Sequence, residues 1–225
     1  MGIDKFIEWL GFAYLGSQMP RFWDGLLITL GLSGVAIVGA IVWGLVLVGP
    51  RMSRRRMVSV PVLAYIELVR NTPLLLQIYL VYFGLPLIGF PLSAFLCGVI
   101  AIASQHGSFL AEVYRAGIEA ISRHQWEASK ALGMQRRQIM RLVILPQAFL
   151  KIVPPFGNQL VILIKDTSLV SAIGIMELTL TGKVVVERSG ASFEVFLLIA
   201  MLYLVLTSSF GTGLRMVENL LRSRY

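Results

Sequence analysis

Residues 127–146 read EASKALGMQRRQIMRLVILP, and this stretch decides how the rest of the chain is interpreted. It opens with the tripeptide EAS at 127–129, reaches Gly133 after three further residues, and reaches VILP at 143–146 after nine more. The stretch is polar and basic, yet it lies between two apolar segments that are long enough to cross a bilayer. This context predicts a docking element rather than a catalytic one.

The composition of the chain indicates that most of it is solvated by lipid. Of its 225 residues 56% are hydrophobic and only 14% are charged, and the mean hydropathy is +0.77. A soluble domain of this size would need more polar surface. The sequence therefore predicts an all-α, polytopic membrane protein.

The net charge of +8 first suggests a nucleic-acid partner, but its distribution argues against one. Thirteen of the twenty Lys and Arg residues fall in alternate connections between apolar segments, as the positive-inside rule describes. These are Arg51, Arg54, Arg55, Arg56, Arg115, Arg123, Lys130, Arg136, Arg137, Arg141, Arg215, Arg222 and Arg224. We expect contact with the bilayer and none with nucleic acid.

About five segments are long enough for transmembrane helices, near residues 24–48, 60–85, 91–113, 142–164 and 193–214. Five spans with basic loops inside place the N-terminus outside and the C-terminus in the cytoplasm. The organisation that we predict is an interfacial helix at 1–19 and a transmembrane domain at 20–225, with a cytoplasmic loop at about 114–141.

The N-terminal segment has a helical repeat of apolar residues opposite charged ones. The apolar residues of this repeat are Ile3, Phe6, Ile7, Leu10 and Tyr14. Acidic Asp4 and Glu8 stand where a signal peptide would be basic. We predict a short amphipathic helix lying on the membrane surface.

Two of the predicted spans are interrupted. In the second, Pro73 follows Asn71 and Thr72 and is expected to open a new half-helix capped by one of them. In the fourth, prolines at 146, 154 and 155 are expected to kink the helix. Irregular backbone at membrane depth is tolerated where it lines a wet cavity, which favours a transport path.

Polar residues inside the spans are candidates for the lining of that path. Glu67 and Arg70 share a helix face in the second span, where the alternatives are a solute-facing lining and a local ion pair that fixes the break. In the third span Gln105, Ser108 and Glu112 share one face. The remaining candidates are Thr72, which is also a possible cap, Asn158, expected to be a buried amide, and Asp166 near the outer face.

Patterns for catalysis or metal binding are weak. His106 lacks a second ligand four residues on, and Cys97 lies in an apolar run. Gly182-Lys183 is followed by Val184 and lacks the upstream glycine of a phosphate-binding loop. We therefore expect no enzyme activity, no metal and no cofactor of the chain's own.

The chain resembles the permease subunits of polar amino-acid ABC importers, of the histidine, glutamine, arginine and opine type, from about residue 20 onward. The stretch that opens this section is similar to the family's docking pattern E-A-A, three residues, G, nine residues, I-x-L-P, with Ser129 and Val143 as departures. Tyr65 to Pro73 looks like its Y-x-E-x-x-R-x-T-P segment, and Ala111 to Ile118 like its A-E-x-x-R-x-x-I segment. The run 165–169, KDTSL, points to the amino-acid branch.

The resemblance implies a type I importer fold and alternating access driven by partners. Those partners are ABC ATPase subunits that bind ATP, a second permease subunit (a copy or a paralogue), and a periplasmic binding protein that delivers a polar amino acid. It implies a bacterial cytoplasmic membrane location. A coupling helix at about Arg123 to Leu132 would grip the ATPase through Glu127, Ala128, Ser129 and Gly133.

Other interpretations remain open at this point. The docking pattern also fits ABC permeases for methionine, phosphonate or an ion. A secondary transporter working without an ATPase would be expected to show inverted repeats and more spans. An embedded enzyme or a regulatory anchor is disfavoured by the missing catalytic residues.

Overall fold

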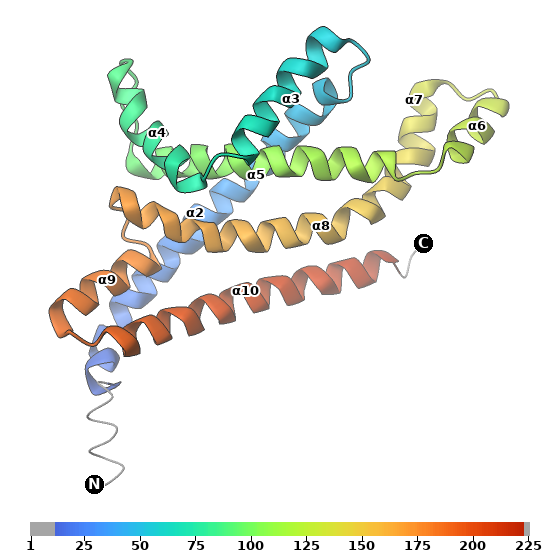
Figure 1. The fold of residues 1–225 in the computed structure, drawn as a ribbon. Helices are drawn as coiled ribbons and strands as arrows, with labels where there is room; N and C mark the ends of the chain where they lie inside the picture. The colour runs from blue at the N-terminus through green and yellow to red at the C-terminus, as the bar shows by residue number, and fades with distance from the viewer. Residues whose placement is uncertain (1–11, 223–225) are drawn as a thin grey trace. The chain divides into compact units, whose positions relative to one another are not determined.

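The computed structural model describes residues 12–222, and side chains from 15 to 221. Every regular element in this part of the chain is helical, which confirms the all-α prediction (Figure 1). The elements are α2 (Phe12–Arg51), α3 (Arg56–Arg70), α4 (Leu74–Leu87), α5 (Ala94–Glu119), α6 (Arg123–Ala131), α7 (Arg136–Gln138), the π-helical η1 (Ile139–Ile144), α8 (Leu145–Asp166), the 3₁₀-helical η2 (Thr167–Ile173), α9 (Leu178–Ser189) and α10 (Ser192–Arg222).

Four helical stretches are long and apolar enough to cross a membrane: Leu15–Arg51, Ala94–Glu119, Arg136–Ile173 and Ser192–Leu221. The bent pair formed by α3 and α4 makes a fifth if it is counted as one broken span. The polytopic fold with about five spans is therefore confirmed, including the break in the second.

The capping that we expected at this break is wrong in detail. Pro73 is the residue before α4, and no side chain caps that helix. Instead, Asn71 Nδ2 donates to the carbonyl oxygen of Glu67 (2.8 Å) and Thr72 Oγ1 to that of Leu68 (2.7 Å). Both side chains bond to carbonyls of the last turn of α3, and the Glu67 carbonyl also accepts the backbone N–H of Asn71 (3.0 Å).

The predicted amphipathic segment lies mostly outside the described residues, because the description begins at residue 12. From there α2 runs without interruption to Arg51, so residues on both sides of the expected boundary at 19 belong to one helix. The interfacial position of the N-terminal segment stays a prediction.

The chain divides into two compact units. The first comprises Met1–Ile37, Pro73–Ile102 and Leu163–Ser209. In it α9 and the first part of α10 pack on α2 through a cluster that includes Phe22, Leu178, Val185 and Val195. Thr29 Oγ1 accepts the backbone N–H of Leu178, so the start of α9 is also held by a buried hydrogen bond.

The second unit comprises Val38–Thr72, Ala103–Ile162 and Phe210–Tyr225, and it contains the predicted docking loop. Its α2 and α5 segments approach closely at glycines. A Cβ added at Gly107 would lie 2.9 Å from the Cβ of Trp43, and one at Gly44 would lie 3.0 Å from the Cβ of Leu110. Small residues that let two backbones approach are the usual means of packing helices in a membrane.

The prolines of the fourth predicted span lie within α8. Pro154 and Pro155 are inside the helix, and Pro146 is its second residue, directly after the π-helical segment η1. A proline lacks the N–H that an α-helix would direct at the fourth residue before it. The helix departs from α geometry before Pro146, as a π segment, and continues as an α-helix through Pro154 and Pro155. The expected kink stays a prediction.

Candidate functional site

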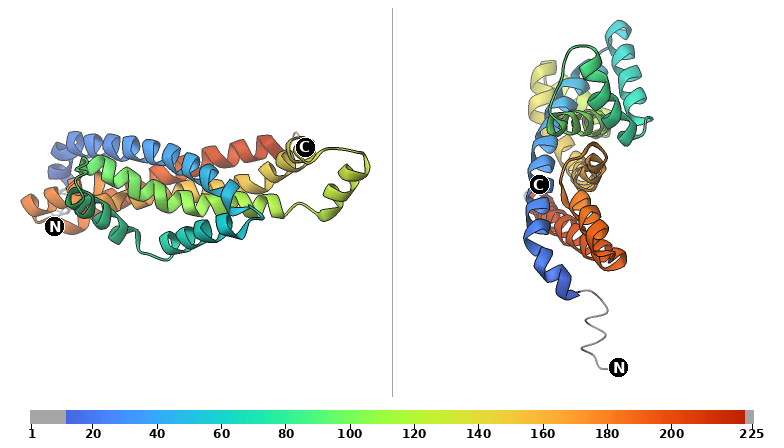
Figure 2. Two further views of the ribbon diagram at one scale, coloured as in Figure 1. Left: turned by 90° about the horizontal axis from the view of Figure 1, so that it is seen from above. Right: turned by 90° about the vertical axis from the view of Figure 1, so that its left-hand side faces the viewer.

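The docking loop contains one helix of its own, α6, where the sequence predicts it. It projects at the end of the second unit where α5 finishes and α8 begins (Figures 1 and 2). A cluster of buried Ile121, Ile139, Ile144 and Ala148 lies beneath it, and Trp126 of α6 packs against that cluster. The apolar contacts therefore join α6 to the end of α5 and the start of α8.

Gly133 closes α6 in a Schellman motif. Its φ angle is +76°, its N–H donates to Lys130 O (2.9 Å), and the N–H of Met134 donates to Ser129 O (3.2 Å). The two bonds satisfy carbonyls that the helix end leaves open, and the left-handed residue between them favours glycine. The left-handed backbone at this position explains why the docking pattern has a glycine there.

The residues of the tripeptide 127–129 face two directions. Glu127 and Ala128 are exposed, whereas Ser129 is buried and its Oγ donates to Gln125 O (2.7 Å). Serine in place of alanine is thus accommodated without an unpaired hydroxyl. Glu127 lies 3.9 Å from His124 Nδ1 and is otherwise open to a partner. An exposed carboxylate on a rigid helix suits docking.

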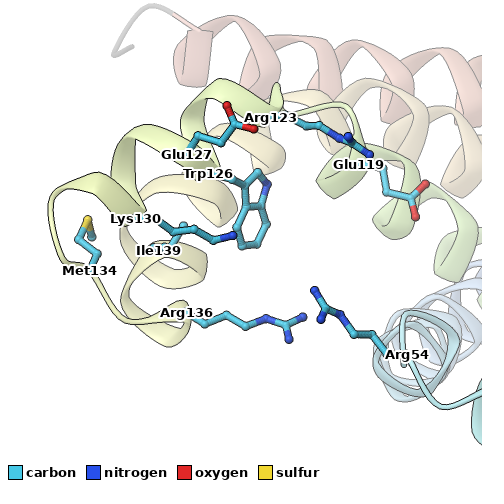
Figure 3. A pocket seen from close by; sticks show the side chains of 9 residues that line it. All are labelled: Arg54, Glu119, Arg123, Trp126, Glu127, Lys130, Met134, Arg136 and Ile139. Atoms are coloured by element: carbon cyan, nitrogen blue, oxygen red, sulfur yellow. The ribbon is translucent and has the colours of Figure 1, made fainter.

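A basic pocket of about 860 Å³ opens beside α6 (Figure 3). Its cationic residues come from three elements: Arg123 and Lys130 from α6, Arg136 from α7, and Arg54 from the connection between α2 and α3. The other lining residues are Glu119, Trp126, Glu127, Met134 and Ile139. In the sequence these cations fall in two separate loops, and nothing in their spacing indicates that they share a pocket.

Glu112, one of the predicted path residues, is held by two arginines. Its Oε1 accepts from Arg51 Nε (2.9 Å), and its Oε2 accepts from Arg115 Nε (2.9 Å) and Nη2 (2.6 Å). Arg115 is also paired with Glu119. Both carboxylate oxygens of Glu112 therefore have charged partners within the chain, which ties the last residue of α2 to α5.

Arg70 lies close to Glu112 in a separate cavity of about 450 Å³, which Phe109 and Lys151 also line. The Arg70 guanidinium lies 4.8 Å from the Phe109 ring centroid, and its Nη1 is 3.9 Å from Glu67 Oε1. Its buried Nε has no hydrogen-bond partner among the described residues. The side chain as a whole is 31% exposed, and a guanidinium held over an aromatic ring is a suitable partner for an anionic group.

The other residues predicted to line the path have different surroundings. Ser108 is buried and donates to Ser104 O (2.9 Å), which satisfies its hydroxyl within α5. Gln105 and Asp166 are half-buried. Of the eight predicted path residues, the 450 Å³ cavity brings together only Arg70 and Glu112.

The expectation that Asn158 is a buried amide is wrong, because its side chain is exposed on this chain. The amide that bonds to a buried group is on the neighbouring residue: Gln159 is half-buried, and its Nε2 lies 2.8 Å from Nδ1 of His106, which is 1% exposed. A helix turns about 100° per residue, so adjacent positions face different surroundings and a sequence alone does not say which faces inward.

Four polar contacts were not anticipated because their partners are far apart in the sequence. Arg51 reaches Glu112 across 61 positions. Tyr65 OH accepts from Trp43 Nε1 (2.9 Å) and lies 2.7 Å from Ser104 Oγ. In the first unit, fully buried Glu177 accepts from Tyr203 OH (2.9 Å). For the contact of Glu177, the available signal was a lone carboxylate within an apolar stretch of the sequence. The other contacts have no local sequence signal.

Residues 36–223 match the family model described as the inner membrane component of binding-protein-dependent transport systems. The matched region contains α6 and its glycine cap as well as both charged clusters. The chain belongs to this family. It is a membrane-spanning permease component, as the resemblance in its sequence indicated.

Several named relatives are similar to this permease along nearly all of their length. It is 34% identical to the probable glutamine ABC transporter permease protein GlnM of Bacillus subtilis over 211 residues, covering 94% of the permease and 98% of GlnM. It is 33% identical to the glutamine transport system permease protein GlnP of Escherichia coli over 203 residues, covering 89% and 93%.

Solved structures agree with this assignment. The permease is similar to a chain of an amino acid ABC transporter crystallised with histidines, with a TM-score of 0.88 and 36% identity over 92% of this chain and 97% of that one. An inward-facing structure of the MetNI methionine ABC transporter has a TM-score of 0.68 at 18% identity, covering 98% and 99%, and shows a shared fold alone.

Proposed function

We propose that this permease forms part of the membrane path of an ATP-driven importer of a polar amino acid, and that α6 couples it to a separate ATPase. The observation that carries the proposal is the exposed Glu127–Ala128 face on a helix fixed by the Gly133 cap and by its own apolar core. The named relatives support the substrate class, because they are glutamine and amino-acid permeases.

The apolar core beneath α6 supports a mechanism for coupling. ATP-driven closure of the ATPase subunits displaces α6 as a rigid element, since Trp126 packs against the apolar cluster that contains Ile139 and Ile144. The same cluster contains residues from the end of α5 and the start of α8, so the displacement reaches both helices. Rocking of packed helices about a fixed site is the usual form of alternating access.

The substrate path proposed here passes the cavity lined by Arg70, Phe109 and Glu112. The partly exposed Arg70 guanidinium is a cation of this cavity that a substrate carboxylate can approach. Both oxygens of Glu112 are already engaged by arginines. Glu67, Thr72, Gln105, Ser108, Asn158 and Asp166 are further positions along the proposed path.

The remaining parts of the proposal concern the assembly. A second permease subunit, a copy or a paralogue, completes the path, and a periplasmic binding protein delivers the amino acid. The ATPase partner binds and hydrolyses ATP. The basic loops face the cytoplasm, which places the N-terminus outside and the C-terminus inside the cell.

Purification of the tagged permease from membranes in mild detergent tests the coupling role directly. We expect an ATPase to co-purify in equal amount, and we expect its loss when Glu127→Ala and Gly133→Val are combined. A permease that purifies alone and still moves solute into vesicles without ATP would identify a secondary carrier instead. Uptake of glutamine, arginine and methionine by the intact assembly then distinguishes the amino-acid branch from other solutes.

A further inference from the structure

Lys151 is a charged residue inside an apolar stretch, and the fold does not pair it. It is the only charged residue between Arg141 and Lys165 in the sequence. It lies in α8, within the helical stretch Arg136–Ile173 that is long and apolar enough to cross a membrane, and its side chain is exposed. None of the carboxylates that the structure describes forms an ion pair with it. Since an ammonium group that faces acyl chains is costly, this side chain requires water or an anion beside it.

Lys151 lines the cavity of about 450 Å³ that the proposed substrate path passes. Pro155, one helical turn further along α8, lines it too, so one face of this helix forms part of the wall. Arg70 reaches the same cavity from α3, and Phe109 and Glu112 reach it from α5. All of these residues belong to the second unit. The polar surroundings that Lys151 requires are therefore those of this cavity.

The charges of the cavity lining do not cancel. Its cations are Arg70 and Lys151, and its one carboxylate is Glu112. Glu112 is already paired with two arginines outside the lining, at 2.9 Å and 2.6 Å. Glu67, which lies 3.9 Å from Arg70, is not part of the lining, and its side chain is 53% exposed. The cavity therefore keeps an excess of positive charge.

We propose that Lys151 selects the transported amino acid by the charge of its side chain, accepting acidic and amide side chains and rejecting cationic ones. This inference deepens the proposed function and rests on it. The α-ammonium and α-carboxylate groups are common to all amino acids, so an excess charge in the path discriminates through the side chain alone. A lysine ammonium has three donors and no acceptor, which suits a carboxylate or a carboxamide oxygen. A cationic substrate side chain would bring like charge and further donors.

The two cations of the lining suit different parts of such a substrate. The Arg70 guanidinium is held 4.8 Å from the Phe109 ring centroid, and its planar fork matches a carboxylate, the group that every amino acid has. Lys151 has a flexible four-carbon stem and no ion pair with a described residue, so its ammonium can reach side chains of different length. Arg70 thus serves all substrates, and Lys151 is the residue that determines specificity.

The test uses the whole assembly, which is the permease with its ATPase and any second permease subunit. Uptake of labelled glutamine into vesicles, with the binding protein present, tests the proposed function. Displacement of labelled glutamine from the purified assembly by glutamate and by arginine, without the binding protein, tests the selection by charge. The two measurements can fail separately, because the binding protein imposes its own selectivity on uptake alone.

Three variants isolate the charge of Lys151. Lys151→Met removes the charge and keeps an unbranched side chain of similar length. Lys151→Arg keeps the charge. Lys183→Met is the matched control, because Lys183 is an exposed lysine of α9 that does not line the cavity.

We expect glutamate to displace labelled glutamine from the wild type at a concentration about tenfold lower than arginine, the order expected for charge interactions in a partly hydrated cavity. Lys151→Met should reduce this ratio of concentrations about tenfold, whereas Lys151→Arg and Lys183→Met should keep it. A loss of folded protein does not change a ratio measured on one sample, so the ratio distinguishes selection from a purely structural role.

A wild-type preference for arginine, or an unchanged ratio in Lys151→Met, would contradict the selection by charge. With uptake intact, either result would leave the proposed function standing. Separation of the second permease subunit in Lys151→Met, but not in Lys151→Arg, would assign Lys151 to an ion pair with that subunit and overturn the inference. Absence of uptake for every amino acid tested would instead reject the proposed function, and this inference with it.

Discussion

The docking loop around α6 and the cluster around Glu112 are both rich in charge, but different interactions hold them in place. In the loop the charged side chains are exposed, and the geometry comes from an apolar cluster and the glycine cap at Gly133. In the cluster, ion pairs between the charged side chains hold the helices together, since Glu112 is paired with both Arg51 and Arg115.

The two regions differ in whether the charged side chains are exposed to a partner or are already paired within the chain. A charged group on an apolar support can be exchanged with little effect on folding, and its effect appears in binding. A charged group held among others of opposite sign is costly to remove, because its partners are left unpaired. The same residue type therefore predicts different experimental results in the two regions.

The largest effect should come from the glycine that supports the loop. Gly133→Val places a β-branched residue at a φ of +76°, which costs about 1–2 kcal/mol or more and releases the end of α6. We expect amino-acid uptake by the assembly to be abolished, with membrane insertion unchanged. Uptake in vesicles and ATPase co-purification measure the two consequences of this change.

Gly190→Val is the matched control for that substitution. Gly190 also has a positive φ, +72°, at the end of a helix, and a Cβ added at either glycine would meet nothing within 4 Å. The backbone strain is therefore similar, but α9 is not part of the docking loop. If both variants lost the ATPase equally, general destabilisation would explain the result and the role of Gly133 in docking would be rejected.

The next effect tests the charge cluster. Glu112→Ala leaves two partly buried arginines without their shared carboxylate and should destabilise the permease by about 3 kcal/mol. Glu127→Ala, in the loop, should cost less than about 0.5 kcal/mol because that side chain is exposed. Thermal unfolding in detergent measures both; equal costs would refute the contrast between the two regions.

Arg70 sharpens the comparison, since it lines the same cavity as Glu112 but has no carboxylate closer than Glu67 at 3.9 Å among the described residues. Arg70→Gln should raise the amino-acid concentration for half-maximal uptake about tenfold, because a hydrogen bond to a charged group contributes about 1.5–3 kcal/mol. Arg56→Gln at the opposite end of α3 is the control. Unchanged half-saturation in the Arg70 variant would make that residue structural.

The smallest expected effect is on the pH dependence of stability and concerns Glu177 in the first unit. Its side chain has no ion pair with a cation among the described residues. Glu177 accepts the N–H groups of Thr179 (2.9 Å) and Leu180 (2.8 Å), and its burial raises the pKa of its carboxyl group above the ordinary value. The folded state thus holds this proton more tightly than the unfolded state.

The stability contributed by that proton is complete below the pKa of an unfolded glutamate. It is lost as the pH rises through the raised pKa of Glu177 in the folded state. Glu177→Gln should remove this loss and leave the melting temperature less dependent on pH above about 4.3, the ordinary glutamate value. A variant that keeps the wild-type slope would assign the pH dependence to other groups.

The sequence predicted what depends on neighbours along the chain. The coupling helix, its glycine cap and the break before Pro73 all follow from residues within one or two helical turns of each other. The family resemblance rested on the same local patterns, and the comparisons confirm it.

The sequence could not predict contacts that join distant segments. The bond between Arg51 and Glu112 depends on how α2 meets α5, and neither local pattern contains it. Whether Asn158 or Gln159 is the amide that faces His106 depends on the rotation of α8 about its axis, which prolines and the π segment alter. Hydrophobic periodicity is least informative where a helix departs from 3.6 residues per turn.

The π segment η1 also fixes how many residues the connection to α8 must contain. In an α-helix, Ile139 and Ile144 would point about 140° apart, yet both are buried in the same cluster, because i to i+5 bonding brings residues five apart onto one face. Ile144 and Ala148, four apart, then continue that face in α8. Deleting one residue here would let the helix become regular, but it would turn everything before it by about 100° and carry Glu127 away from its present face. The spacing of nine residues between Gly133 and Val143 therefore sets the rotation of the exposed face of α6 relative to α8.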